Sequence, residues 1–368
     1  MALQQTLKLK DDHKHELPET VAAVKQAAAD TGKSPLSLVA DWWRNSSKRG
    51  KLTIFEYMQY QLYKASFTPE QKQAFISERL NWDIVDQVSG LHWRAATEDK
   101  FLSYQILGSL GVPVPETIAV ADTSIRQYGD LPKLTNKEEL EAFLTMQRNF
   151  PIFVKPNGEL GSHGAFMIYG VENGELIVNG DERTSFAAIW DEAVSKGPYL
   201  FQACVTCHED IRALTERVAT IRTINLVDDD GLSTPYCLFK IPTGKNVADN
   251  FWRTGNLLAN LDPETGKIVR VVSQKGLEII EHETHPETEA PLIGWQVPHW
   301  KEVLELNRKC AENFAPVRYQ SLDITVTDNG PLVIEINSGS SFVLPQLATG
   351  EGMMTEEIAG FFKKHGWE

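Results

Sequence analysis

Alternating apolar and polar residues near the C-terminus predict a β-hairpin. Residues 323–337 read DITVTDNGPLVIEIN, two alternating runs on either side of Asp328-Asn329-Gly330. A two-residue Asn-Gly turn would place Asp323 on the face of the apolar side chains. A three-residue loop closed by Gly330 in the left-handed region shifts the register by one residue. We expect this second register, because the buried face of a strand pair sets its register.

This register sorts the side chains of the hairpin into two faces. The predicted apolar face carries Leu322, Ile324, Val326, Leu332, Ile334 and Ile336. The other face carries Asp323, Thr325, Val333, Glu335 and Asn337, with Asp323 directly opposite Glu335. Two carboxylates about 4.5–5.5 Å apart at Cβ repel one another unless a positive charge lies between them. Their hard oxygens suit Mg²⁺, whereas a hairpin whose acids face bulk water is the alternative.

The N-terminal quarter of the chain has helical spacing, and we expect helices through residues 17–90. Capping boxes pair Thr53 with Glu56 and Thr68 with Gln71. Beyond this region, Thr97 is the expected cap of a helix over residues 98–110 that contains Lys100 and ends at Gly111. Further helices are expected at 136–147, 298–314 and 355–364. Strands are expected at 117–121, 152–154, 165–171, 199–205, 217–227 and 236–241.

A glycine-rich loop over residues 155–164 is the second candidate for chemistry. Glycines recur every third residue in KPNGELGSHG, which leaves backbone N–H groups free to approach an anion closely. Lys155, at the end of the preceding strand, could place an ammonium on the same anion. A Walker A loop and a dinucleotide fingerprint both open a helix, and here a strand follows. A hairpin loop that needs glycine only for its turns is the alternative.

Composition narrows the class of protein. The chain has 368 residues, a formal net charge of −14 and 42% hydrophobic residues, as expected of a globular protein with two or three domains. The negative charge argues against sequence-independent nucleic-acid binding. We find no secretory signal and no run of about 18 apolar residues, so we expect a cytoplasmic protein with no membrane span. A phosphate-binding protein of this charge must gather its basic residues locally.

Two short motifs resemble metal sites but lack the required spacing. Cys204 and Cys207 have the spacing of a zinc or redox half-site without a second such pair, so we interpret them as incidental thiols. His282-Glu283-Thr284-His285 is one residue short of the zinc-protease helix motif. We interpret it as a surface turn.

Taken together, the order of these motifs resembles the ATP-grasp superfamily, which includes D-alanine–D-alanine ligases and glutathione synthetases. The details are most similar to the sugar-transfer associated ATP-grasp group and the α-L-glutamate ligase relatives. That likeness spans roughly residues 50–350 and is carried by Asp99-Lys100, Ile221-Arg222-Thr223, Asp249-Asn250 followed by Gly255, and Asp262 with Thr265-Gly266.

The resemblance implies an α+β ATP-grasp fold, in which two α+β subdomains grip ATP. The expected division is an N-terminal helical region at 1–90, an ATP-grasp subdomain at 91–150, a glycine-loop lid at 151–200 and a C-terminal subdomain with the metal site at 201–368. It leaves open whether the N-terminal helices contact a substrate or form the interface of a homodimer.

The resemblance also implies roles for individual residues. Lys100 and Lys155 would contact the ATP phosphates, beneath a loop that contains Gly158, Gly161, Ser162, His163 and Gly164. The hinge residues Gln202, Ala203 and Val205 would hold adenine, with His208 near the ribose. Mg²⁺, with Mn²⁺ as an alternative, would be bound by Asp323, Glu335 and Asn337. The acceptor and the transferred phosphoryl group would face Arg222, Asp249, Asn250 and Arg253.

One position departs from the family pattern. Many ATP-grasp ligases carry an arginine two residues before the metal-binding aspartate, and here that position is Ser321. We expect Arg222 or Arg253 to supply the missing charge.

The resemblance favours an ATP-dependent ligase that joins a small-molecule carboxylate to an amine through an acyl phosphate. The acceptor would be a small metabolite or a sugar or peptide precursor. A phosphotransferase that stops after phosphoryl transfer is the first alternative, since the same site serves both reactions. A non-catalytic nucleotide-binding partner is the second, and it predicts the loss of a metal ligand or a phosphate-binding lysine, neither of which is missing.

Overall fold

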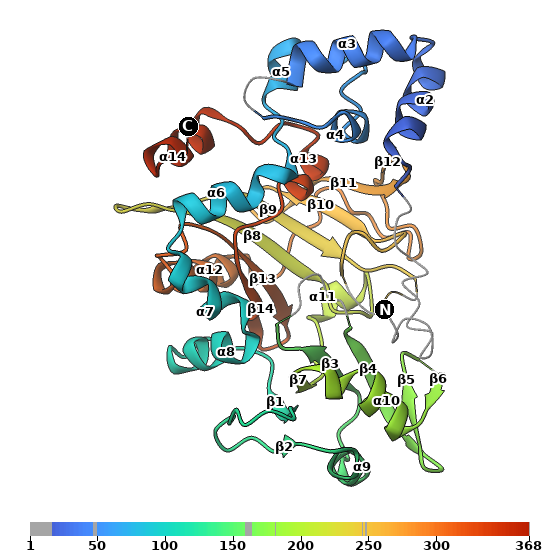
Figure 1. Ribbon diagram of the computed structural model, residues 1–368, viewed down its shortest axis with the longest axis vertical. Coiled ribbons are helices and arrows are strands. Elements are labelled where there is room, and N and C mark those ends of the chain that lie inside the picture. The colour runs from blue at the N-terminus through green and yellow to red at the C-terminus, as the bar shows by residue number, and fades with distance from the viewer. Residues whose placement is uncertain are drawn as a thin grey trace.

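The chain forms two β-sheets with helices packed around them, as expected of an α+β protein. The computed structural model describes residues 17–46, 50–158, 164–180, 182–244, 246 and 249–367. Within these residues each sheet has seven strands. Figure 1 shows the larger sheet in the middle of the molecule, the smaller sheet at one end and helices α2 to α5 at the other.

The smaller sheet draws its strands from the middle of the chain. In spatial order they are β2 (Lys133–Leu134), β1 (Thr117–Ala121), β7 (Tyr199–Ala203), β3 (Ile152–Pro156), β4 (Phe166–Glu172), β5 (Glu175–Val178) and β6 (Glu182–Thr184). Only the pairing of β1 with β2 is parallel among these described strands. The sheet therefore combines strands from the expected segments 91–150 and 151–200, and β7 runs past residue 200.

The larger sheet is antiparallel throughout its described strands. In spatial order they are β12 (Glu278–Glu281), β11 (Ile268–Lys275), β10 (Leu257–Leu261), β9 (Leu232–Ile241), β8 (Thr220–Val227), β13 (Tyr319–Thr327) and β14 (Gly330–Ser338). The predicted hairpin is β13–β14 and forms one edge of this sheet. Its neighbour β8 carries Arg222.

Helices precede the first sheet, as the sequence predicts. They are α2 (Thr20–Thr31), α3 (Pro35–Ser46), α4 (Ile54–Gln59), α5 (Pro69–Gln73) and α6 (Asn81–Val88), with 3₁₀ turns at Glu78–Leu80 and Leu91–Trp93. Both predicted capping boxes are present, at Thr53 with Glu56 and at Thr68 with Gln71. Because each box satisfies two backbone N–H groups, it fixes where its short helix begins.

The helix around Lys100 begins later than predicted. The structure has two helices here, α7 (Arg94–Glu98) and α8 (Lys100–Ser109), and the cap of α8 is Asp99 rather than Thr97. Thr97 lies inside α7, where its hydroxyl donates to the carbonyl of Arg94. Gly111 follows α8 with φ of 66°, as expected of a glycine that ends a helix. The break at Asp99 places Lys100 at the first position of α8.

The other helices lie between the strands in sequence. They are α9 (Lys137–Met146), α10 (Phe186–Glu192), α11 (Glu209–Arg212), α12 (Trp300–Asn313), α13 (Val343–Thr349) and α14 (Glu356–Lys364), with a 3₁₀ turn at Val194–Lys196. None of the described helices is long and apolar enough to cross a membrane.

Both faces of the larger sheet are buried. One face, with Ile224, Leu226 and Leu258, shares a core with the N-terminal helices, α13 and α14. The opposite face, with Ile221 and Phe239, shares a core with α8 and α12. Each fully buried large apolar side chain stabilises the fold by about 1.5–3 kcal/mol. The N-terminal helices are therefore part of the same folded unit as the larger sheet.

The N-terminal region also holds the turn that follows β14. The half-buried carboxylate of Glu78 accepts from the backbone N–H of Phe342 at 2.7 Å and of Val343 at 3.3 Å. The amide of Asn81 donates to the carbonyl of Ser340. Burial raises the pKa of Glu78 to about 7, and the backbone donors only partly oppose this shift.

We predict that Glu78 makes stability fall as the pH rises from about 4.5 to about 7. In this window the folded state keeps the Glu78 proton and the unfolded state has lost it. Glu78→Gln should therefore gain stability relative to the wild type by about 2 kcal/mol across the window, a value reduced for partial exposure. Chemical denaturation at several pH values measures this. The exposed Glu138→Gln should show no such trend, and a pH-independent difference for Glu78→Gln would contradict the assignment.

Candidate functional site

A cavity of about 320 Å³ is lined by residues from both sheets. One part of its lining is apolar and includes Phe153, Met167, Tyr169, Val205 and Val218. The other part is charged and includes Lys100, Lys155, Glu216, Arg217, Asp249 and Glu335. Apolar walls suit a flat ring, and convergent charges suit an anion. The cavity therefore has the two kinds of surface that a nucleotide requires.

Strand β7 and the connector after it form one wall of the cavity. Gln202, Ala203 and Val205, which the sequence predicts at an adenine site, all line it. The Gln202 side chain is buried and donates to the hydroxyl of Thr117 at 3.1 Å. The Ala203 N–H donates to the carbonyl of Glu116 at 2.9 Å. These contacts fix the wall to the strand β1.

The two predicted phosphate-binding lysines enter the cavity from different elements. Lys100, on α8, pairs with Glu335 at 3.0 Å. Lys155, at the end of β3, donates to the hydroxyl of Tyr104 at 2.7 Å. Burial lowers the pKa of Lys155 to about 8, although Glu335 and Asp323 oppose the shift. Lys155 is therefore still mostly protonated at neutral pH.

Tyr104 links this lysine to the strand that carries Glu335. Its hydroxyl accepts from Lys155 and donates to the carbonyl of Ile334 at 2.7 Å. Tyr104 lies one helical turn after Lys100 on α8, so both side chains lie on the same face of this helix. Helix α8 thus positions Lys100 directly and Lys155 through Tyr104.

A buried ion cluster lies next to the charged end of the cavity. The guanidinium of Arg222 donates to both oxygens of Asp323, at 2.9 and 2.7 Å. Lys240 lies 3.2 Å from Asp323 and 3.0 Å from Asp249. Burial alone would raise the pKa of Asp323, but Arg222 and Lys240 outweigh it and lower the pKa to about 2. Asp323 is therefore ionised throughout the physiological pH range.

Positive charge gathers at this end of the site. Lys100, Lys155, Arg222 and Lys240 face three carboxylates, those of Asp249, Asp323 and Glu335. These residues together carry one net positive charge, in a chain whose formal charge is −14. An acidic protein that binds phosphate must gather basic residues locally, and the site has such a local excess of cations.

The hairpin confirms the predicted pairing of Asp323 with Glu335 but reaches it differently. Thr327 pairs with Gly330, so the turn has two residues, Asp328 and Asn329, instead of the predicted three. A bulge at Ile334 then shifts the register by one residue. Ile324 pairs with Val333, and Asp323 still pairs with Glu335. Gly330 has a positive φ, as predicted.

The bulge corrects the predicted faces of the hairpin. Val333 lies in the core, whereas Ile334, predicted to be core, lines the cavity and Leu332 is only half-buried. The Val333 N–H donates to the carbonyl of Pro113 at 2.9 Å. Since the Ile334 carbonyl accepts from Tyr104, the segment from α8 to β1 supplies partners for both backbone groups at the bulge.

Asn337 lies on the same strand as Glu335, and its pairing partner on β13 is Ser321. The amide nitrogen of Asn337 is buried without a hydrogen-bond partner in the described part of the chain. Ser321 donates to the carbonyl of Gly339 at 2.9 Å. Arg222 brings a guanidinium to Asp323, two residues beyond Ser321.

Several predicted site residues in the described part of the chain lie outside the lining of the cavity. Arg222 and Asp323 belong to the ion cluster next to it, and Gly158, Gly164, His208, Asn250, Arg253 and Asn337 are not part of the lining either. Asn250 stabilises its own loop, since its carbonyl accepts from the Asn256 amide at 2.8 Å. Arg253 belongs to the same loop, where its N–H donates to the Asn250 carbonyl. His208 caps α11, and its ring lies beside that of His299, with 5.4 Å between the centroids. The structure therefore does not bring His208 to the cavity wall.

Only part of the glycine loop lies within the described residues. Gly161, Ser162 and His163 fall outside them. Gly164 has φ of 74°, and a Cβ atom there would lie 2.8 Å from the Tyr199 hydroxyl. Gly164 therefore needs glycine for both its conformation and its space. Gly158 has open space around it.

Sequence reasoning missed Lys240, Tyr104 and Thr220. Lys240 lies near the end of β9 in a mostly apolar run, where a single lysine gives no functional signal. The Thr220 hydroxyl donates to Asp249 and lines the cavity. Cys204 and Cys207 are free thiols, and no described residues form a metal-binding cluster of His, Cys, Asp and Glu.

Comparison with known proteins gives a family match and several similar folds. Residues 93–359 match the sugar-transfer associated ATP-grasp family. D-alanine–D-alanine ligase from Bacillus anthracis, complexed with ATP, is 15% identical with a TM-score of 0.39, over 75% of this chain and 69% of that one. The VanG D-Ala:D-Ser ligase from Enterococcus faecalis is 11% identical with a TM-score of 0.42, over 80% and 67%. No curated protein matches the sequence.

The family match covers well over half of the chain and includes the elements that line the cavity. It contains both lysines, the connector after β7 and the hairpin of Asp323 and Glu335. The expected ATP-grasp fold is confirmed by this match together with the two sheets around the cavity. The chain belongs to the sugar-transfer associated ATP-grasp family.

Proposed function

We propose that the protein is an ATP-dependent carboxylate–amine ligase. Family membership supports ATP binding. The observation that carries the proposal is the position of the Asp323 cluster beside the two lysines of the cavity. Cations placed there can neutralise both the nucleotide phosphates and an acceptor carboxylate.

The reaction needs positioning and charge neutralisation more than covalent chemistry. A carboxylate oxygen attacks the γ-phosphorus, the bond to the bridging oxygen breaks, and ADP leaves. An amine nitrogen then attacks the acyl carbon, the bond to the phosphate oxygen breaks, and the amine loses a proton. In this scheme Lys100 and Lys155 bind phosphate oxygens. The glycine loop covers the intermediate and excludes water.

In the same scheme the apolar wall and the connector residues Gln202, Ala203 and Val205 bind adenine. Arg222 and Asp249 face the acceptor, and Lys240 fixes the position of both Asp249 and Asp323. Asn250 and Arg253 contribute through the loop that follows Asp249. The acceptor is a small carboxylate, and the second substrate is a small amine.

The donors on the hairpin fit magnesium. Asp323 and Glu335 are opposed in the register, and the buried amide of Asn337 has an unpartnered nitrogen. Rotation of the Asn337 amide by half a turn would exchange its nitrogen for its oxygen. Asp323, Glu335 and Asn337 would then offer three hard oxygen donors on the paired strands β13 and β14. Asp323, Glu335 and Asn337 would therefore hold the ion, with manganese as an alternative. When bound, it supplies further neutralisation of the phosphate oxygens.

We predict that phosphate release requires both a carboxylate and an amine. Purified protein is incubated with ATP, Mg²⁺ and pools of acids and amines, singly and together, while phosphate and products are measured. An amide product that forms only with both pools supports the ligase. A stable phosphorylated product from one acceptor would show a phosphotransferase instead. Nucleotide binding without turnover on any pool would show a non-catalytic partner.

We predict that Glu335→Gln lowers turnover about a hundredfold, because it removes a carboxylate that holds the ion and Lys100. The concentration of Mg²⁺ needed for half-maximal turnover should rise as well. Asp328→Asn, in the exposed turn of the same hairpin, is the matched control and should behave as the wild type. Unchanged magnesium dependence in Glu335→Gln would refute the proposed metal site.

We predict that ATP binding weakens as the pH rises above about 8, because Lys155 then loses its proton. Tyr104→Phe should move this loss to lower pH, since it removes an acceptor that stabilises the ammonium form. Calorimetric titration of ATP between pH 6.5 and 9.5 tests both statements. Tyr236→Phe, half-buried against the core under the N-terminal helices, is the control. Identical profiles for Tyr104→Phe and wild type would contradict the link.

A further inference from the structure

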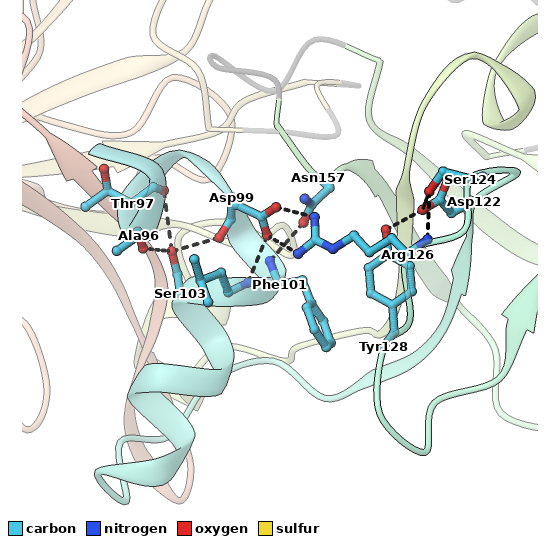
Figure 2. Close-up of polar contacts among 11 residues, drawn as sticks. Ala96, Thr97, Asp99, Phe101, Ser103, Asp122, Ser124, Arg126, Tyr128 and Asn157 are labelled. Carbon is cyan, nitrogen blue, oxygen red and sulfur yellow. Dashed lines mark hydrogen bonds and ion pairs between the residues drawn. The ribbon is translucent and has the colours of Figure 1, made fainter. Parts of the chain in front are cut away.

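Asn157, which directly follows β3, accepts hydrogen bonds from the start of α8 (Figure 2). The Asn157 carbonyl accepts from the Lys100 N–H at 3.1 Å, and its side-chain oxygen accepts from the Phe101 N–H at 2.8 Å. Asp99 accepts from the next N–H, that of Leu102, at 2.9 Å. The first three N–H groups of α8 are therefore satisfied, and Lys100 can bind a phosphate only through its side chain.

Asn157 is itself fixed at its other end. Its N–H donates to the carbonyl of Pro198 at 2.9 Å, just before β7, and the residue is buried. It directly precedes Gly158 and the loop that follows. The position of Lys100 relative to Asn157 and Gly158 thus depends on how the start of α8 is held.

Arg126 holds that start through Asp99. Its guanidinium donates to both Asp99 oxygens, at 3.1 Å from Nη2 to Oδ1 and more closely from Nη1 to Oδ2. The Asp99 carboxylate therefore receives the helix N–H and the guanidinium together. Burial opposes ionisation of Asp99, but Arg126 and the Leu102 N–H lower its pKa, so the pair stays charged. An arginine that binds a carboxylate with two bonds also fixes its orientation.

The loop that carries Arg126 is built to present this side chain. Asp122 accepts from the N–H of Ser124 at 2.8 Å and from the hydroxyl of Tyr128 at 2.7 Å. The guanidinium lies 5.0 Å from the centroid of the Tyr128 ring and 5.7 Å from that of Phe101. A surface ion pair contributes little when its side chains are mobile. Here two aromatic rings and an Asx turn hold the arginine in place (Figure 2).

We propose that Arg126 is a positioning residue, which acts through Asp99 to hold the start of α8, and with it Lys100, in position beside Asn157. Arg126 is not part of the cavity lining as described, so it does not bind the nucleotide itself. The proposal rests on the proposed role of Lys100 as a phosphate ligand. A phosphate-binding side chain displaced by about 1 Å can lower activity as much as the loss of its contacts would.

The test is a double-mutant cycle read by calorimetric ATP affinity. We expect Arg126→Ala to weaken ATP binding about tenfold, within the range found for coupled residues. Combined with Lys100→Ala, it should cause little further loss, because it acts through Lys100. Millimolar guanidinium chloride should restore much of the affinity of Arg126→Ala, since the site is partly exposed. A merely destabilised protein would not recover. Arg126→Lys should keep only part of the ATP affinity, because lysine cannot bind the Asp99 carboxylate with two parallel hydrogen bonds.

Arg308→Ala, on the exposed side of α12, is the matched control and should bind ATP as the wild type does. Losses that add in the double mutant, or no loss in Arg126→Ala, would overturn the inference while the proposed function stands. Rescue that also occurs in Lys100→Ala would overturn it too. A wild-type protein that fails to bind ATP would refute the proposed function first, and this inference with it.

Discussion

The buried charge of Asp323 is the constraint on which the site and the larger sheet both depend. An unpaired ion in a protein interior costs several kcal/mol, and removing one partner of a buried pair typically costs about 3–5 kcal/mol. Asp323 finds its partners on two neighbouring strands, Arg222 on β8 and Lys240 on β9. A slip of one residue in either strand would turn that partner to the opposite face. The register of three strands is therefore coupled to the charge of the site.

The N-terminal helices stabilise the other end of this arrangement. They bury one face of the larger sheet and hold the turn after β14 through Glu78 and Asn81. A Cβ atom at Gly339, in that turn, would lie 2.6 Å from the Val85 side chain on α6. The strand that carries Glu335 and Asn337 is thus fixed at its end by a region outside the ATP-grasp elements.

Much of the fold could be predicted from the sequence, because its signals are local. Alternation with a period of two placed Asp323 opposite Glu335, and capping boxes located two of the helices. The bulge could not be predicted, since its backbone partners include Tyr104, 230 positions away. The role of Lys240 could not be predicted, because it comes beside Asp323 only when β8, β9 and β13 pair in the folded sheet. Thr97 and Asp99 are both residue types that can cap a helix. The cap of α8 is Asp99, whose carboxylate also binds Arg126, a contact that the local sequence does not reveal.

The bulge in β14 has a consequence for solubility. A strand at the edge of a sheet presents unpaired N–H and carbonyl groups, which can template pairing with another molecule. In β14 the Val333 N–H and the Ile334 carbonyl are already bound within the chain, and α7 and α8 pack against the strand. The opposite edge, β12, is four residues long and begins and ends with exposed glutamates. Neither border of the larger sheet therefore offers a long, flat template for aggregation.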